Sequence, residues 1–85
     1  MNYTVVWEQE AEDALALLWT NAADQAAVTS AADAIDRLLA RDPYGHGESR
    51  SAKSRILFVP PLVVLYTVSD SNRTVYVTAV GLSRP

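Results

Sequence analysis

The side chains best able to do chemistry lie between residues 46 and 55. Arg50, Lys53 and Arg55 form the one dense cluster of cations in the sequence, just before a run of apolar residues. Such a cluster suits contact with an anion, either the phosphates of RNA or the carboxylates of a protein partner. It suits equally well a basic loop that balances acidic helices elsewhere in the chain. The residues alone leave these two interpretations open.

His46 lies between Gly45 and Gly47 and is the only histidine. It can be a general base or a contact residue, but a lone histidine in a loop is most often solvated. The His46-x-Glu48 spacing occurs in zinc deaminases, which also need a downstream pair of cysteines, and this chain has no cysteine. Gly45-x-Gly47 lacks the third glycine of a phosphate-binding loop. We therefore expect neither a metal ion nor a cofactor.

A second cluster, Glu8, Glu10, Glu12 and Asp13, is acidic. Residues two apart on a helix point in different directions, so these carboxylates do not converge on a metal. They suit the first turn of a helix, where negative charge meets the positive end of the helix dipole. The first 36 residues contain no Lys or Arg, and the net charge of the chain is −3. An acidic total disfavours nucleic-acid binding, although the basic second half can form a local patch.

The elements that position these residues follow from periodicity and from helix-ending signals. Residues 55–68 are the most apolar stretch, and Pro60-Pro61 divides them into two strands that meet at a corner. Asp24 is a good N-cap for a helix that ends at Asp42-Pro43, because proline disfavours helical backbone in the residue before it. The expected elements are strands at 2–7, 55–59, 62–68 and 74–80, a helix from the acidic cluster to about Asn21, a second helix from 24 to 42, and a loop at 43–54.

This order predicts one α+β domain over residues 1–85, a two-layer β-α-α-β-β-β arrangement with a helical hairpin packed on a small, mainly antiparallel sheet. The many alanines let the two helices approach each other closely. In the last strand, Val75, Val77 and Ala79 are expected to face one way and Tyr76 the other.

The expected compartment is the cytoplasm. The N-terminal residues have no basic flank and no long apolar run, so we read no secretory signal there. The absence of cysteine fits a reducing compartment. The apolar stretch at 55–68 is too short and too interrupted to cross a membrane.

The sequence resembles the RelE/ParE toxin superfamily over nearly its whole length. The resemblance is carried by a short opening strand ending in Trp7, two Ala/Leu-rich helices, Asp42-Pro43, and two strand patterns. These patterns are Arg55-x-Leu-x-Val-Pro-Pro-Leu-x-Val-Leu-Tyr-x-Val68 and Val75-x-Val-x-Ala-Val-Gly81. The resemblance implies the toxin of a two-gene bacterial toxin–antitoxin (plasmid-stabilisation) module, which an antitoxin wraps and neutralises. RelE-like members cleave mRNA on the ribosome, and ParE-like members act on DNA gyrase.

The nuclease residues of RelE-like members are poorly matched. Those enzymes carry a basic residue two positions before the aliphatic-Tyr pair. The corresponding position in this chain is occupied by Val63. The paired lysines of those enzymes correspond approximately to Ser54 and Ile56 in this chain. Lys53 and Arg55 each lie one position away.

In those enzymes, basic residues follow the Val-Gly of the final strand. In this chain the only basic residue after Val-Gly is Arg84, and it lies out of register. RNA cleavage needs positive groups around the phosphate, plus an acid and a base. No catalytic residue is therefore assigned.

Three hypotheses follow from the resemblance. The first is a toxin that acts by binding a protein, with gyrase or an unknown protein as its target. The second is a diverged ribosome-dependent mRNA endonuclease, and the third is a member that has lost toxicity. A homodimer and a hetero-oligomer with the antitoxin both stay open. The residues predicted to contact the target or the antitoxin are Arg50, Lys53, Arg55, Arg84 and His46.

Overall fold

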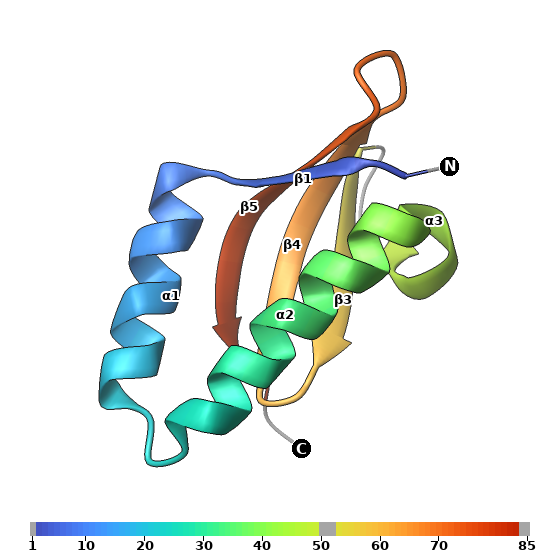
Figure 1. Cartoon of the computed structure of the whole chain (residues 1–85). Coiled ribbons are helices and arrows are strands. Elements are labelled where there is room, and N and C mark those ends of the chain that lie inside the picture. Colours follow the sequence, from blue (N-terminus) through green and yellow to red (C-terminus); the bar gives the residue numbers. More distant parts are fainter. Residues whose placement is uncertain (1, 50–52, 84–85) are drawn as a thin grey trace.

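The computed structural model describes residues 2–49 and 53–83 (Figure 1). Its elements, in chain order, are β1 (Thr4–Trp7), α1 (Gln9–Asn21), α2 (Gln25–Arg41), α3 (Pro43–His46), β2 (Glu48–Ser49), β3 (Ser54–Val59), β4 (Leu62–Ser69) and β5 (Thr74–Leu82).

One sheet contains all five strands, in the order β1-β5-β4-β3-β2. Strands β3, β4 and β5 are successive antiparallel neighbours, and the short β2 pairs antiparallel with β3. Only β1 runs parallel to its neighbour, β5, so that the first and last strands of the chain lie side by side (Figure 1). The predicted two-layer α+β domain with a mainly antiparallel sheet is confirmed.

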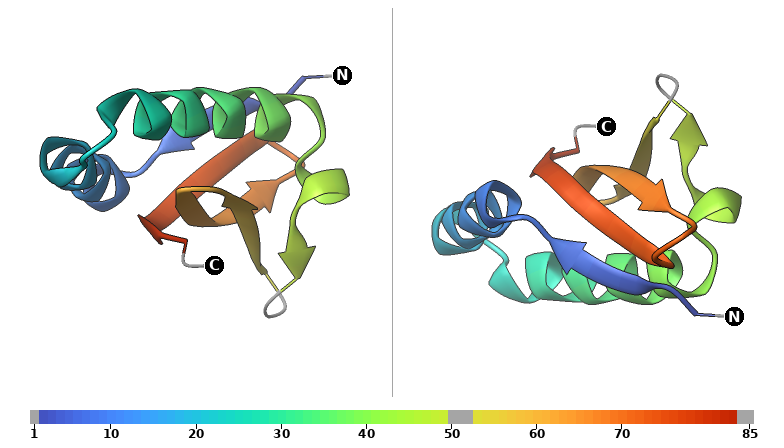
Figure 2. Two further views of the ribbon diagram at one scale, coloured as in Figure 1. Left: turned by 90° about the horizontal axis from the view of Figure 1, so that it is seen from below. Right: turned by 90° about the horizontal axis from the view of Figure 1, so that it is seen from above.

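Helix α2 crosses one face of the sheet and contacts β1, β3 and β4, whereas α1 packs along β5 (Figures 1 and 2). The Asp24 carboxylate caps α2 by accepting a hydrogen bond from the Ala27 amide at 3.0 Å, as its position in the sequence predicts. The helices are close together at the turn between them and diverge from it in a V (Figure 1). The predicted helical hairpin is present, and its two helices approach each other closely near the turn only.

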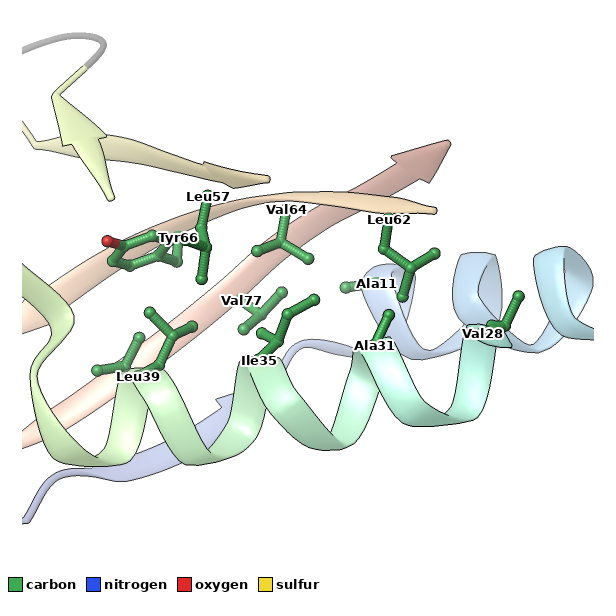
Figure 3. Packing of buried hydrophobic residues seen from close by; sticks show 11 residues of the cluster. Ala11, Val28, Ala31, Ile35, Leu39, Leu57, Leu62, Val64, Tyr66 and Val77 are labelled. Carbon is green, nitrogen blue, oxygen red and sulfur yellow. The ribbon is translucent and has the colours of Figure 1, made fainter. Parts of the chain in front are cut away.

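The core lies between α2 and the sheet (Figure 3). Ile35 and Leu39 point from α2 toward strand residues that are equally buried, among them Val64 and Val77. Burying one side chain of this size contributes about 1.5–3 kcal/mol. The buried apolar residues are Ala11, Val28, Ala31, Ile35, Leu39, Leu57, Leu62, Val64, Tyr66, Val75 and Val77.

A β-bulge in β5 changes which residues face the core. Tyr66 pairs with Val77 and Leu65 with Ala79, which leaves Thr78 as an extra residue. After the bulge Val80, and not Ala79, packs against the core. The expected alignment of Ala79 with Val75 and Val77 is wrong for this reason.

The predicted boundaries differ most around the loop at 43–54. Asp42 accepts a hydrogen bond from the Gly45 amide at 3.0 Å and caps the short helix α3, and β2 follows it. A helix of one turn has no periodicity that a sequence pattern can reveal. The final strand extends to Leu82, two residues beyond the predicted end at residue 80. Within the described residues, no helix is long and apolar enough to cross a membrane.

Candidate functional site

A pocket of about 450 Å³ lies where α3, β2 and the strands β3, β4 and β5 meet. We call it the sheet-end pocket. Lys53 and Arg55 supply positive charge to it, and Tyr44 and Tyr76 supply aromatic surface. The described residues that line it are Tyr44, Ser49, Lys53, Arg55, Thr67, Val68, Ser69 and Tyr76.

Arg55 forms a wall of this pocket and is fixed in place by backbone acceptors. One terminal nitrogen, Nη2, donates to the carbonyl oxygens of Tyr44 at 3.0 Å and Gly47 at 2.8 Å. Its guanidinium lies 5.4 Å from the centre of the Tyr44 ring, within the range of a cation–π contact. Its Nε is buried and has no hydrogen-bond partner among the described residues. The side chain therefore ties α3 to β3 while keeping its charge at the pocket.

Asp70, in the turn between β4 and β5, fixes the other side of α3. Its carboxylate accepts hydrogen bonds from the hydroxyls of Tyr44 at 2.8 Å and Tyr3 at 2.9 Å. These two donors hold the pKa of Asp70 below its usual value. Donation to the carboxylate also raises the pKa of both phenols, and Tyr44 is accordingly a neutral hydrogen-bonding group near pH 7. Arg73 lies 4.7 Å from the centre of the Tyr3 ring.

The floor beneath α3 is Tyr66, which is fully buried. Its hydroxyl donates to the Pro43 carbonyl oxygen and so satisfies a polar group that the core would otherwise leave unpaired. Gly47 passes so close that a Cβ there would lie 1.9 Å from the Tyr66 Oη. Only glycine fits at this crossing. Tyr44, Tyr66 and Arg55 together place the α3 segment against the sheet.

The structure brings together two of the five predicted site residues. Lys53 and Arg55 both line the sheet-end pocket. His46 is exposed at the end of α3 and is not among the lining residues. Arg50 and Arg84 lie outside the described residues, and their predicted role stays a prediction.

Sequence reasoning missed Asp70 and the pairing that assembles the pocket. Asp70 reads only as a turn residue in the sequence, because Tyr3 and Tyr44 are distant from it along the chain. Thr67 lies opposite Tyr76 through the β4–β5 register, on the turn side of the bulge.

The two cations of this pocket make it suited to an anion. None of the described side chains that line it is a His, Asp or Glu. A general acid–base pair therefore has no obvious members there. In the described part of the chain, no group of three His, Cys, Asp or Glu side chains is arranged to bind a metal ion.

The fold is similar to that of several solved toxins. A toxin–antitoxin complex RelBE2 from Mycobacterium tuberculosis superimposes with a TM-score of 0.81 and 20% identity, over 98% of this chain and 93% of that chain. Isolated Escherichia coli RelE superimposes with a TM-score of 0.69 and 14% identity, over 98% of this chain and 86% of that chain. A chromosomal ParDE system from Pseudomonas aeruginosa superimposes with a TM-score of 0.70 and 14% identity, over 96% of this chain and 97% of that chain.

No sequence-family profile and no curated protein matches the chain. Identities of 20% and below establish the fold alone. The chain has the fold of the RelE and ParE toxins, and the resemblance inferred from its sequence is confirmed at that level.

Proposed function

We propose that this chain is the toxin of a bacterial type II toxin–antitoxin module, that a cognate antitoxin binds and neutralises it, and that it acts in the cytoplasm by binding a protein target. The observation that carries the proposal is the structural similarity to a chain of the RelBE2 complex. This similarity covers nearly all of this chain and nearly all of the matched chain. Isolated RelE and the ParDE system share the fold over 98% and 96% of this chain.

Binding to a protein is favoured over RNA cleavage by the composition of the sheet-end pocket. Arg55 Nη2 is already engaged by two backbone carbonyls, and Tyr44 is engaged by Asp70. Val63 pairs with Phe58 on one side and Gly81 on the other, so this stretch of β4 offers apolar surface. A pocket with a fixed Arg55, an exposed Lys53 and no His, Asp or Glu among its described lining residues fits the carboxylates of a protein partner.

The second candidate is a ribosome-dependent mRNA endonuclease. It is favoured by the presence of Lys53 and Arg55 in one pocket with Tyr44 and Tyr76. Two cations can stabilise charge on a phosphate, and an aromatic ring can stack on a base. This candidate requires that Lys53 or a tyrosine replace the usual acid and base.

Induced expression in a bacterium tests the proposal. The chain should arrest growth, and co-expression of a small adjacent reading frame should relieve the arrest. Damage to DNA with intact mRNA would point to gyrase among the protein targets. A Val28→Asp variant, with a charge in the core, is the unfolded control. No arrest in any host, with folded protein present, would contradict toxicity and favour the diverged, non-toxic member of the fold.

A further inference from the structure

The face of the sheet opposite α2 carries apolar side chains that the described part of the chain leaves open. In Figure 2, α2 lies on one side of the sheet, and no described helix lies over β4 from the other side. Leu65, in the middle strand β4, has 37% of its surface exposed, and Phe58 on β3 has 48%. A single exposed apolar residue is ordinary, but a contiguous apolar patch marks an interaction surface.

The strand register joins these exposed residues into one patch. Residues paired across neighbouring strands point to the same face of a sheet. Two rows run from β3 through β4 to β5, Phe58–Val63–Gly81 and Ile56–Leu65–Ala79. We call these six residues the open face. All six are uncharged, and the only charged residue paired with them is Glu48, opposite Ile56 at the edge of the described sheet.

Both rows of the open face decrease in side-chain size from β3 to β5. Phe58 and Ile56 form a ridge on β3, whereas Gly81 and Ala79 leave a trough on β5. The fold itself does not require glycine at residue 81. Its φ is not positive, and a Cβ added there would meet only a Val63 methyl at 4.0 Å. The trough is therefore open space that a side chain from another molecule can fill.

We infer that the open face binds a second copy of this chain, in a two-fold dimer whose sheets pack face to face. A two-fold axis along β4 places β3 of one copy over β5 of its partner. Phe58 then lies over the partner's Gly81, and Ile56 over the partner's Ala79. The ridge of each copy fills the trough of the other, which is the self-complementarity that a two-fold interface requires. Aligned sheets pack in this way about 10 Å apart.

Charge and area define the kind of dimer. Six uncharged residues offer no complement to a charged partner, whereas two copies of one apolar face match each other. Together with the adjoining Thr67–Tyr76 pair, the open face covers roughly 300 Å² at the usual spacing of strands and residues. A standard interface buries about 800 Å² on each partner, so the dimer is transient and dissociates on dilution. The inference does not depend on the proposed function.

Sedimentation velocity of the purified full chain tests for the dimer, from about 10 μM to about 1 mM, the range expected for a small interface. The chain should change from monomer to dimer as its concentration rises. Added NaCl should not weaken the association, because the contact is apolar and each copy carries a net charge of −3. A monomer at every concentration would overturn the inference. So would association that weakens with salt, which indicates contact between oppositely charged surfaces.

An exchange of side-chain size across the interface tests the arrangement. Phe58→Ala and Gly81→Leu should each weaken the dimer at least about tenfold, the first by removing the ridge and the second by filling the trough. The two changes combined should restore affinity to within about threefold of the wild type, because the new side chain occupies the space that the ring leaves. The control is Leu82→Ala. Leu82 is 52% exposed but pairs with the buried Leu62, so it faces the α2 side and should not affect association.

The rescue also separates interface effects from misfolding. Phe58 and Gly81 lie outside the core, so circular dichroism and melting temperatures at low concentration should match those of the wild type. A combined variant that dimerises more weakly than either single variant would overturn the inference. A Leu82→Ala variant that is weakened as much as Phe58→Ala would do the same. A chain that arrests growth but stays monomeric retains the proposed function and loses the dimer.

Discussion

The hollow between α1 and α2, which we call the helical groove, and the sheet-end pocket are opposite in charge and in construction. Carboxylates and indoles are among the described groups that line the groove, those of Glu12, Asp33, Asp36, Trp7 and Trp19. Lys53 and Arg55, by contrast, stand in the pocket beside phenols. The groove separates two helices, each folded from local contacts. The pocket is assembled by hydrogen bonds that join residues far apart in sequence, such as Tyr3 to Asp70 and Tyr66 to Pro43. One small domain thus presents two surfaces whose lining residues are opposite in charge.

The comparison also shows where rigidity resides. Four hydrogen bonds hold α3 against the sheet, two from Arg55 and one each from Tyr44 and Tyr66. The groove is held by two indole hydrogen bonds, from Trp7 to Asp36 and from Trp19 to Thr29, and only Val28 among its lining residues is buried. Damage to the pocket should therefore cost more folding stability than damage to the groove.

Tyr66→Ala should produce the largest loss, about 3–5 kcal/mol of unfolding free energy, because it removes a fully buried aromatic and its hydrogen bond. Tyr66→Phe removes only the hydroxyl and should cost about 1–3 kcal/mol by leaving the Pro43 carbonyl unpaired. Urea denaturation measures both. If Tyr66→Phe is neutral, the hydroxyl does not anchor α3 and the pocket is less rigid than described.

Gly47→Ala should destabilise by about 1–3 kcal/mol, because the new methyl meets the Tyr66 hydroxyl and must displace α3 or the ring. The control is Gly81→Ala, where the nearest atom to a new Cβ is a Val63 methyl at 4.0 Å. That change should stay within about 0.5 kcal/mol. Thermal unfolding of the pair measures the difference, and equal melting temperatures would show that the close approach at Gly47 relaxes freely.

Arg55→Met should cost about 1–3 kcal/mol, because the carbonyls of Tyr44 and Gly47 lose their shared donor. Lys53→Met, a matched loss of charge at an exposed residue of the same pocket, should cost less than about 0.5 kcal/mol. Both variants should lose affinity for an anionic partner. Denaturation measures the structural role, and binding measures the role in anion recognition. A destabilised Lys53→Met would contradict the assignment of the structural role to Arg55 alone.

The smallest expected effect is a loss of folding stability at acidic pH. The pKa of Asp70 is lowered in the folded state, so its stabilising contribution is present above the ordinary carboxyl pKa near 3.8 and is lost as pH falls through the folded value. The melting temperatures of the wild type and Asp70→Asn should therefore converge below about pH 4 and separate above it. The double variant Tyr3→Phe with Tyr44→Phe should follow Asp70→Asn. A difference that does not change with pH would show that the carboxylate charge is irrelevant.

Most of the fold could be predicted because its determinants are local or periodic. The Asp24 cap, the end of α2 before Pro43 and the Pro60-Pro61 corner are each visible within one segment. The β5 bulge could not be predicted, since it depends on how Leu65 meets Ala79 across the sheet.

The candidate site was only partly predictable for the same reason. Lys53 and Arg55 are close in sequence and remain together, but Asp70 joins the site through two tyrosines from distant elements. The anchoring of Arg55 by carbonyls depends on a short helix that no pattern reveals. The helical groove arises from the angle between α1 and α2, which alanine content did not indicate.

The most direct test of the central claim maps mRNA 5′ ends by primer extension in cells arrested by this chain. Action through a protein target predicts arrest with intact mRNA in the wild type, and mRNA that stays equally intact in Lys53→Met, whose arrest should be weaker. Codon-periodic cleavage that appears with the wild type and disappears with Lys53→Met or Arg55→Ala, both folded, would contradict the account and establish the endonuclease.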